Sequence, residues 1–475
     1  MSLNLTKYER DKILERDEFK ILIANQDLLK KFETTYIRTG KIFLEILENT
    51  DKNGLEKSPD GEYINPILWQ CGHIIYFFIQ HCKDYFQIPV FKDDLEMNID
   101  FYDSFKNKSQ FRSEINKLVT INILLDDFKL IYENITEQIL RQKFSDHKYN
   151  YIKTYVLNLC ILHTEMHIEA LIFSGLNLGY QLKNFISFGL SNTSLRGVTT
   201  NIMLNIEFKK IEGGNFIQGS KRSVNYLSFD NERPAFHKKI NSFYISKYPI
   251  TETQYLDFIL DGGYETKSFW TEEGWDWIKK NNITCPLYWK TKDYELRKSN
   301  FPICNISWYE AKAFCRWGGY RLPTESEWEY VATNGNRTKY PWGNKMNAGL
   351  VNLNYTINRP LEVNDDRLIF EKTLFGVQQL IGNVWEWCEE PIYPYDGFNI
   401  DPVYREMSYP FFGFKKICRG GCFAVPDYLI HSKYRNAQIP ECRIQFIGFR
   451  VCKDYTDLKK VRKARRLRIT NCIEM

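Results

Sequence analysis

The stretch Leu162-His163-Thr164-Glu165-Met166-His167-Ile168-Glu169-Ala170 decides how the rest of the chain is interpreted. It lies in a segment from Tyr151 to Phe173 that has no Pro or Gly and repeats apolar side chains every three or four residues, which predicts a helix. His163 and His167 then lie one turn apart on the same face, where two imidazoles can share a metal ion. A helical pair of histidines is more often exposed or hydrogen-bonded than metal-bound, so the pair alone leaves metal binding open.

A third ligand has to come from another element, because two imidazoles rarely complete a redox metal site. The chain has only seven His, and His73 is the one in a similar apolar run, Asn65 to Phe78. We therefore take His73 as the third ligand. The order His-Thr-Glu-Met-His differs from the His-Glu-x-x-His of zinc proteases, because Glu165 follows the first His by two residues and would face away from the metal. A zinc protease is disfavoured.

Length and composition indicate a folded protein of more than one domain. At 475 residues the chain is too long for one core, which suggests two or three domains. Aromatic residues make up 16%, with 11 Trp and 30 Tyr, which rules out disorder. Much of the net charge of +5 lies in the basic run 459–468. A solvated tail explains this run better than contact with nucleic acid or an anionic membrane, so we expect no nucleic-acid partner.

The expected compartment is the cytoplasm. The first ten residues lack an apolar core for secretion, and we see no run of about 18 apolar residues that would cross a membrane. The 12 Cys include no CxxC pair, so neither a zinc knuckle nor a disulfide framework is indicated. Most of these thiols, such as Cys160 and Cys315, are expected in the core.

The N-terminal part is predicted to be helical, because it contains few helix-breaking residues. Amphipathic runs separated by polar loops cover residues 8–47, 66–86, 111–144 and 151–173. Four such helices suggest an up-and-down bundle, in which side chains on facing helices converge in the core. His73 on the second helix, and His163 with His167 on the fourth, fit that arrangement.

The composition changes after residues 185–200, where the helical period breaks. The second part is rich in Gly, Trp, Pro and Asn, and a helical period returns only around 306–317 and 324–333. Thr324 and Glu327 begin the latter helix as a capping box, directly after Pro323. An irregular mixed domain of this kind usually carries its ligand contacts on loops.

Several motifs give these two parts a family resemblance. In order, the second part contains Gly213-Gly214-Asn215-Phe216-Ile217-Gln218-Gly219-Ser220, Arg321-Leu322-Pro323-Thr324-Glu325-Ser326-Glu327-Trp328-Glu329, Gly382-Asn383-Val384-Trp385-Glu386-Trp387, Arg419-Gly420-Gly421 and Gly448-Phe449-Arg450. Together they resemble the formylglycine-generating enzymes, whose fold is a C-type-lectin-like mixed domain. Asn-Pro-x-Leu-Trp-Gln-x-Gly-His at 65–73 and His-x-x-Met-His-x-Glu-Ala-Leu at 163–171 resemble the DinB-like half of the sulfoxide synthases that build ergothioneine, ovothiol and selenoneine.

The resemblance implies an α+β protein made of two domains with different roles. Residues 1–190 would form a four-helix DinB-like bundle that carries the metal ligands. Residues 200–456 would form the irregular C-type-lectin-like domain of the formylglycine-generating enzymes. Residues 457–475 would be a basic tail. We expect a monomer, although nothing in the sequence reports the oligomeric state.

The resemblance also implies the chemistry. His73, His163 and His167 would hold a mononuclear non-haem Fe(II), with positions left open for a thiolate and dioxygen. The small-molecule partners would be a thiol, cysteine or γ-glutamylcysteine, and an imidazole amino acid, histidine or hercynine. In these families the thiol sulfur is oxidised to a sulfoxide and joined to a carbon of the imidazole ring.

A tyrosine near the iron steers this reaction away from plain thiol oxidation in the related enzymes. By its distance from Arg419-Gly420-Gly421, Tyr404 is the first candidate and Tyr395 the second. Each has a simpler interpretation as an apolar anchor with a hydrogen-bonded hydroxyl. The choice therefore remains open between the two tyrosines.

Substrate contacts are expected from Arg435, Asn436 and Gln438, within an Arg-Asn-x-x-x-Pro segment, and from Met166 on the histidine helix. Actinobacterial-type ergothioneine synthases have Trp and Asp after Arg-Asn, whereas this chain has Ala437 and Gln438. Some relatives have a Gln in place of Met166, and Met offers no comparable hydrogen bond. These departures leave the identity of the imidazole substrate open.

Two further sites follow from the resemblance. Arg112 is a candidate partner for the carboxylate of the thiol, with an ordinary surface cation as the alternative. Asn383 and Glu386 are the candidate ligands of a structural calcium ion. Glu169 is expected to orient a ligand or to make an ordinary buried polar contact.

Other functions are weighed against the sulfoxide synthase. Formylglycine generation uses a pair of Cys near Arg-Gly-Gly. After the motif this chain has Cys422 and then no further Cys until Cys442, so formylglycine generation is rejected. A selenoneine-type homologue that forms a C–Se bond remains an alternative, as does a non-catalytic lectin-like module that only binds a ligand. The chain stops before a methyltransferase of the ovothiol type, which favours an ergothioneine- or selenoneine-type role and leaves a split ovothiol pathway open.

Overall fold

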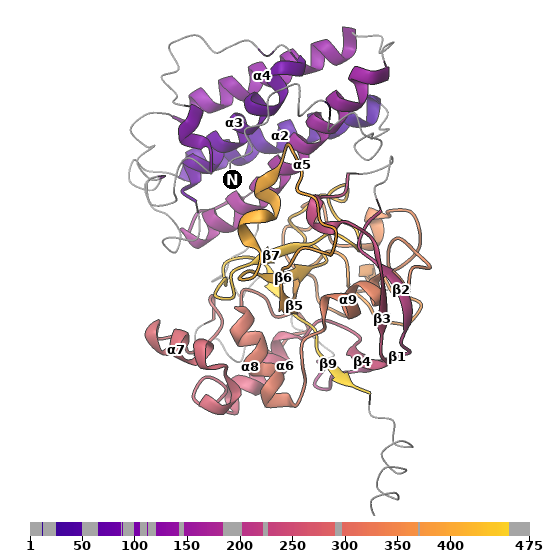
Figure 1. Ribbon diagram of the computed structural model, residues 1–475. Coiled ribbons are helices and arrows are strands. Elements are labelled where there is room, and N and C mark those ends of the chain that lie inside the picture. The colour runs from indigo at the N-terminus through magenta and orange to yellow at the C-terminus, as the bar shows by residue number, and fades with distance from the viewer. Residues whose placement is uncertain are drawn as a thin grey trace, which may run out of the picture.

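Figure 1 shows the computed structural model, in which a group of long helices is followed by a mixed domain of short strands, short helices and loops. The structure describes residues 12, 25–49, 65–86, 88, 99–104, 112, 120–141, 147–183, 202–221, 227–289, 297–368 and 371–455. The predicted α+β class is confirmed. The expected boundary at 185–200 and the basic tail 457–475 both lie outside the described residues, so the domain limits remain a prediction.

Within the described residues, the N-terminal part is built from four long helices. They are α2 (Asn25–Asn49), α3 (Ile67–Phe86), α4 (Ile121–Arg141) and α5 (His147–Asn177), with the 3-10 helix η4 (Ile99–Tyr102) between α3 and α4. Helix α5 packs against α2 and α3, and α4 packs against the same two helices. The helices predicted at 66–86 and 151–173 are confirmed, whereas α4 begins ten residues later than expected.

Helix α5 is apolar on nearly all sides because it is covered on nearly all sides. Its Tyr151–Asn177 segment is long and apolar enough to cross a membrane by length and composition, so the expectation that no such segment exists is wrong. However, 83% of its most apolar window is buried inside the fold. Burial against α2, α3 and the second domain explains the apolar composition.

The described part of the second domain contains three small sheets. The first sheet has the strand order β1 (Phe208–Ile211), β4 (Phe243–Ser246), β9 (Cys452–Asp454). The second sheet pairs β2 (Gly214–Gln218) with β3 (Phe236–Ile240). The third sheet has the strand order β7 (Asn436–Gln438), β6 (Lys416–Arg419), β5 (Trp385–Pro391), β8 (Ile447–Gly448). All pairs are antiparallel except β5 with β8. The strands are short, so loops make up much of the domain.

The helices of this domain are also short. They are α6 (Glu252–Leu260), α7 (Glu272–Lys280), α8 (Trp308–Gly318) and α9 (Glu325–Ala332), with the 3-10 helices η7 (Asp230–Glu232), η8 (Lys267–Phe269), η10 (Ala348–Leu350), η11 (Asp366–Leu368), η12 (Arg405–Met407) and η13 (Tyr409–Phe411). The capping box of Thr324 and Glu327 is confirmed. Helices α6 and α7 were not predicted, although Thr251 and Gln254 form a capping box that signals the start of α6.

Buried arginines explain why the second domain has its sequence motifs. Arg419 of Arg-Gly-Gly pairs with Glu329 at 2.6 Å, and Arg450 of Gly-Phe-Arg pairs with Glu386 at 2.6 Å. Arg419 also donates to three successive carbonyls, those of Ser432, Lys433 and Tyr434. Because a buried charge is tolerated only when it is paired and hydrogen-bonded, these arginines fix the loops around them.

Helix α5 forms the junction between the two parts. Glu169 Oε1 accepts hydrogen bonds from Trp385 Nε1 at 2.8 Å and from the Cys422 thiol at 3.2 Å. On another side of the same helix, Glu165 pairs with Arg38 at 2.6 Å and accepts the hydroxyl of Tyr428. Both glutamates therefore bind the second domain, and Glu165 faces away from the histidines as predicted.

Candidate metal centre

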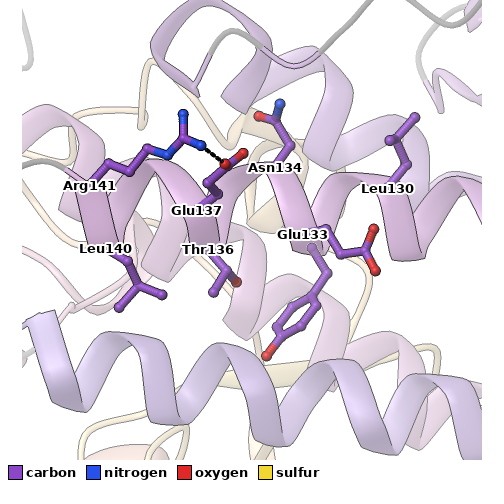
Figure 2. A pocket seen from close by; sticks show the side chains of 8 residues that line it. Leu130, Glu133, Asn134, Thr136, Glu137, Leu140 and Arg141 are labelled. Atoms are coloured by element: carbon purple, nitrogen blue, oxygen red, sulfur yellow. Dashed lines mark ion pairs between the residues drawn. The ribbon is translucent and has the colours of Figure 1, made fainter.

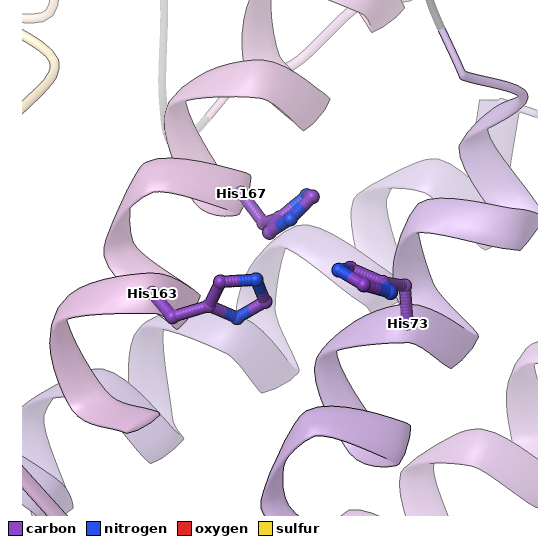
Figure 3. Close-up of side chains that lie close together, drawn as sticks. All are labelled: His73, His163 and His167. Atoms are coloured by element: carbon purple, nitrogen blue, oxygen red, sulfur yellow. The ribbon is translucent and has the colours of Figure 1, made fainter. Parts of the chain in front are cut away.

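Three histidines from two helices converge in the bundle. His73 is on α3, His163 and His167 are on α5, and one ring nitrogen of each lies within 4.8 Å of those of the other two. The ring centroids are 5.0 Å apart from His73 to either partner and 4.6 Å apart between His163 and His167. Figure 3 shows the three imidazoles pointing toward a common space between the helices. The structure thus brings together all three predicted ligands.

His73 is oriented by its neighbours on two sides. Its Nδ1 lies 2.7 Å from the backbone oxygen of Tyr102, and its ring stacks on Trp69 at 4.7 Å. A carbonyl oxygen only accepts, so Nδ1 carries the proton and Nε2 keeps a lone pair. Gly72 permits this packing, because a Cβ there would lie 2.0 Å from the Tyr102 ring.

Burial keeps the three imidazoles uncharged. Loss of hydration lowers the pKa of His73 to about 4, and it lowers the pKa of His163 and His167 well below the usual value. The positive charge of Arg112 adds to the lowering for His73 and His167. Neutral imidazoles are the form that binds a metal ion.

The residues present fit a metal ion. Nδ1 of His163 and Nδ1 of His167 are buried without a hydrogen-bond partner. A buried polar atom without a partner is costly, and two such atoms in one histidine cluster are explained if a bound ion organises the rings. Three neutral imidazoles without a carboxylate suit Fe(II), zinc, copper or nickel rather than calcium or magnesium.

Tyr404 lies beside this cluster although it comes from the second domain. Its ring packs edge-on against the His163 ring at 5.2 Å and against Phe77 at 5.2 Å. Phe77 in turn stacks on His163 at 3.7 Å. The first tyrosine candidate is therefore in contact with a predicted metal ligand.

Tyr395, the second candidate, belongs to a different environment. Its hydroxyl accepts from Gln218 Nε2 at 3.2 Å, its ring packs on Phe236, and the Arg435 guanidinium lies 4.1 Å from its centroid. Burial raises its pKa well above the usual value. These contacts place Tyr395 in the interior of the second domain rather than at the histidines.

The four predicted substrate contacts are not gathered in one place. Met166 lies on the histidine face of α5 and is only partly buried. Asn436 and Gln438 are partly buried on the edge strand β7, where Gln438 pairs with Lys416 of β6. Arg435 is fully buried and bound to Glu325 at 2.6 Å and to the carbonyls of Asn231 and Tyr393, so its visible role is structural.

The partly exposed residues of α5 mark the open side of the cluster. Met166, His167 and Ala170 are partly exposed and lie on one helix face, whereas His163 is 1% exposed. A small molecule would approach from this face. Tyr404 contacts the cluster on its buried side, at His163.

Phe229 of the second domain lies at the junction beside the Tyr404 ring. The Phe229 ring packs against Tyr404 at 6.3 Å and Tyr434 at 5.7 Å. Tyr434 is buried and also packs on Trp385 at 5.9 Å. An aromatic wall from the second domain therefore faces the bundle next to the histidine cluster.

The proposed calcium ligands do not fit that role. Both oxygens of Glu386 bind Arg450, and Oε2 also accepts Trp328 Nε1 at 2.7 Å. The Asn383 side chain exchanges hydrogen bonds with the backbone of Leu361, and its Oδ1 also accepts from Asn352 Nδ2. Their oxygens thus serve the protein interior, and the calcium assignment is wrong at these two residues.

A shallow depression on the bundle surface is separate from the site. Figure 2 shows that it runs along α4, with an ion pair between Glu137 and Arg141 at one end. Its lining comes entirely from that helix: Leu130, Tyr132, Glu133, Asn134, Thr136, Glu137, Leu140 and Arg141. It contains none of the histidines and takes no part in the candidate centre.

The fold and this centre together define the class of protein. Residues 203–455, more than half of the chain, match the family described as the sulfatase-modifying factor enzyme 1-like domain. The chain belongs to this family.

Particular relatives carry the comparison further. The hercynine oxygenase of Mycobacterium tuberculosis is 33% identical over 253 residues, which are 50% of this chain and 59% of that protein. The hercynine oxygenase of Mycolicibacterium smegmatis is 33% identical over 261 residues, 51% of this chain and 60% of that protein. The formylglycine-generating enzyme of Thermomonospora curvata is 26% identical over 299 residues, 51% of this chain and 92% of that protein.

These matches confirm the predicted relationship to the non-haem iron sulfoxide synthases. The chain spans less than two thirds of the length of the hercynine oxygenases it matches. The relationship to this family is thus established.

Proposed function

We propose that this protein is an Fe(II)- and dioxygen-dependent sulfoxide synthase that joins a thiol to the imidazole ring of histidine or hercynine. The observation that carries the proposal is the cluster of His73, His163 and His167, whose ring nitrogens lie within 4.8 Å of one another. Its support from relatives is the 33% identity to hercynine oxygenases. The donors proposed are cysteine or γ-glutamylcysteine.

The overall reaction balances with the partners named. A thiol and an imidazole each give up one hydrogen, dioxygen supplies the sulfoxide oxygen, and its second oxygen atom leaves as water. Bound Fe(II) would supply coordination sites for the thiolate and dioxygen and the electrons that activate the latter. His73, His163 and His167 would hold the ion in this proposal.

The chain's own residues prepare the site in several ways. Burial holds the three imidazoles neutral, and the Tyr102 carbonyl fixes the Nδ1 proton of His73, which leaves Nε2 as the binding nitrogen. The edge of the Tyr404 ring against His163 puts its phenol in reach of molecules at the cluster. We propose that this hydroxyl delivers a proton or electron and so favours coupling over plain oxidation of the thiol.

Arg112 supports an anionic thiol substrate. Its guanidinium stacks on Trp69 at 4.2 Å, and Trp69 stacks on His73. It also donates to Asn65 and, at 3.0 Å, to the Ser104 carbonyl. These contacts hold a cation close to the cluster, where the carboxylate of the thiol would bind it.

The competing proposal is a binding module without chemistry. It accounts for the lectin-like domain but gives no reason for three neutral imidazoles to converge in the bundle. A selenol in place of the thiol would use the same site, so a C–Se bond-forming homologue differs only in its donor.

The test is a reconstitution experiment. The protein is loaded anaerobically with Fe(II), then exposed to air with cysteine or γ-glutamylcysteine and with histidine or hercynine in all combinations. The expected product has the summed mass of one thiol and one imidazole, plus one oxygen and minus two hydrogens. Metal-free protein is the control. Iron-loaded protein that binds these molecules and yields no coupled product would favour the binding module.

A further inference from the structure

One carboxylate holds the backbone that carries Tyr404. Asp401 Oδ1 accepts the N–H of Val403 at 2.8 Å and the N–H of Tyr404 at 3.0 Å. Asp401 is 4% exposed, so water does not compete for these bonds. An aspartate that binds the backbone two and three residues ahead sets the course of a turn. The direction in which the Tyr404 side chain leaves the backbone therefore depends on Asp401.

The other oxygen of the same carboxylate is bound from the bundle. The hydroxyl of Tyr155, on α5, donates to Asp401 Oδ2. Burial, and then the charge of Asp401, raises the pKa of Tyr155 well above its usual value, so the hydroxyl keeps its proton and donates. Tyr155 precedes His163 by two helical turns, about 12 Å along the axis. One rigid helix thus carries two of the histidines and the donor that binds the Tyr404 turn.

The second domain holds this turn at other points. Asp230 accepts the Asp401 N–H at 3.1 Å and the Ser408 hydroxyl at 2.7 Å, and Arg233 lies 3.8 Å from Asp401. These contacts fix the turn within its own domain. Tyr155 adds the contact that relates the turn to the helix of the histidines.

We propose that Tyr155 and Asp401 are positioning residues that set Tyr404 against the histidine cluster across the domain junction. The contact rests on the structure alone, and its effect on the product rests on the proposed function. An ordinary interface hydrogen bond would change stability only. A positioning contact also changes the order of the Tyr404 turn and the ratio of coupled product to oxidised thiol.

The first arm of the test uses metal-free protein and measures backbone hydrogen exchange. Tyr155→Phe removes the hydroxyl and keeps the ring, and a hydrogen bond to a charged group is strong enough for about tenfold faster exchange of the Val403 and Tyr404 amides. Tyr428→Phe is the matched control, because Tyr428 donates to the carboxylate of Glu165 across the same junction, away from this turn. It should leave those two amides unchanged.

The second arm uses iron-loaded protein and measures the ratio of coupled product to oxidised thiol. Tyr155→Phe should lower this ratio several-fold, whereas Tyr428→Phe should not. Asp401→Asn keeps an oxygen that accepts from the two amides, and its new NH₂ group can donate a hydrogen bond to the Tyr155 oxygen. The ratio of coupled product to oxidised thiol in this variant should therefore stay near that of wild type.

Unchanged exchange at 403–404 together with an unchanged ratio in Tyr155→Phe would overturn the proposal. A wild-type protein without coupled product would refute the proposed function instead. The exchange arm would still decide whether Tyr155 positions the turn.

Discussion

The backbone carbonyl of Tyr102 accepts a hydrogen bond of 2.7 Å from Nδ1 of His73, so a residue of η4 decides which nitrogen of His73 keeps its lone pair. This contact exists because Tyr102 packs directly on Gly72, the residue before the histidine. A glycine inside a buried helix costs about 1 kcal/mol relative to alanine. Here the missing side chain makes room for the partner of a metal ligand.

Gly72→Ala should therefore weaken metal binding. An added Cβ would lie 2.0 Å from the Tyr102 ring, so the ring and the carbonyl beside it must move away from His73. Loss of such a supporting contact typically costs about 10- to 100-fold in metal affinity, which competition with a chelator would measure. Gly40→Ala in α2 is the control, because a Cβ at Gly40 meets nothing within 4 Å. Equal metal affinities in the two variants would contradict the role of Gly72.

Replacing a ligand should abolish metal binding and leave the fold intact. His163→Ala or His167→Ala removes one of the two α5 nitrogens and leaves too few donors for tight binding. We expect loss of stoichiometric iron after anaerobic loading, measured by elemental analysis, with the helical circular dichroism retained. His237→Ala, at an exposed position of β3, is the matched control and should load iron normally. Full iron content in either α5 variant would refute the ligand assignment.

Tyr404→Phe should change the product and not the metal content. The ring that packs on His163 is kept, while the hydroxyl proposed to favour coupling is lost. The ratio of coupled product to oxidised thiol, measured by mass, should fall by about tenfold or more, the typical contribution of a positioned proton donor being 10²–10⁴-fold. Tyr395→Phe is the comparison and should leave the ratio unchanged, because Tyr395 contacts Gln218 and Arg435 in the domain interior. A larger effect at Tyr395 would transfer the role to that residue.

The histidine pair and its partner could be predicted because they depend on short-range rules. His163 and His167 follow from helical periodicity, and His73 follows from the scarcity of histidine in apolar runs. The Tyr404 candidate came from family spacing, and the structure puts it beside the cluster. Predicting these residues requires only a local sequence period or a motif at a fixed distance along the chain.

Contacts that join distant segments could not be predicted in the same way. Tyr155 lies 246 residues from Asp401, and Glu169 lies 216 residues from Trp385. No local pattern marks either pair, because a buried polar side chain in a helix looks like any other polar residue until its partner is known. The calcium assignment failed for a related reason, since the Arg450 side chain that binds Glu386 comes from another motif.

Removing Arg38 should destabilise the domain junction. Glu165 is fully buried and Arg38 is 14% exposed, so Arg38→Met leaves a carboxylate without its counter-charge. Breaking such a pair costs about 3–5 kcal/mol of unfolding free energy, which urea denaturation of metal-free protein would measure. Lys129→Met is the control, because its pair with Glu133 is 60% exposed on both sides and should contribute under about 1 kcal/mol.

The double variant Arg38→Met with Glu165→Gln tests the cause. With no buried charge left, it should recover at least half of the stability lost in Arg38→Met. If the double variant is as unstable as the single one, packing rather than charge explains the loss.

Glu371 should make stability fall as the pH rises. It is 1% exposed, and burial raises its pKa to about 8, although the N–H groups of Gln379 and Leu380 and the charge of Arg450 favour the ionised form. In the unfolded chain the pKa is about 4.3. Below that value both states are protonated and the full stability is present. Between pH 4.3 and 8 only the unfolded chain ionises, so folding loses up to about 1.4 kcal/mol per pH unit from this group.

Glu371→Gln removes the ionisation and should flatten this part of the curve. Urea unfolding at pH 5, 6, 7 and 8 would give the difference between wild type and variant, which should shift steadily in favour of the variant as the pH rises. The variant need not be more stable at any one pH, because one of its side-chain atoms is now a donor facing backbone N–H groups. Glu265→Gln, at an exposed position, is the control and should run parallel to wild type. Parallel curves for Glu371→Gln would mean that Glu371 is ionised in the folded protein throughout this range, held so by Arg450 and the two N–H groups.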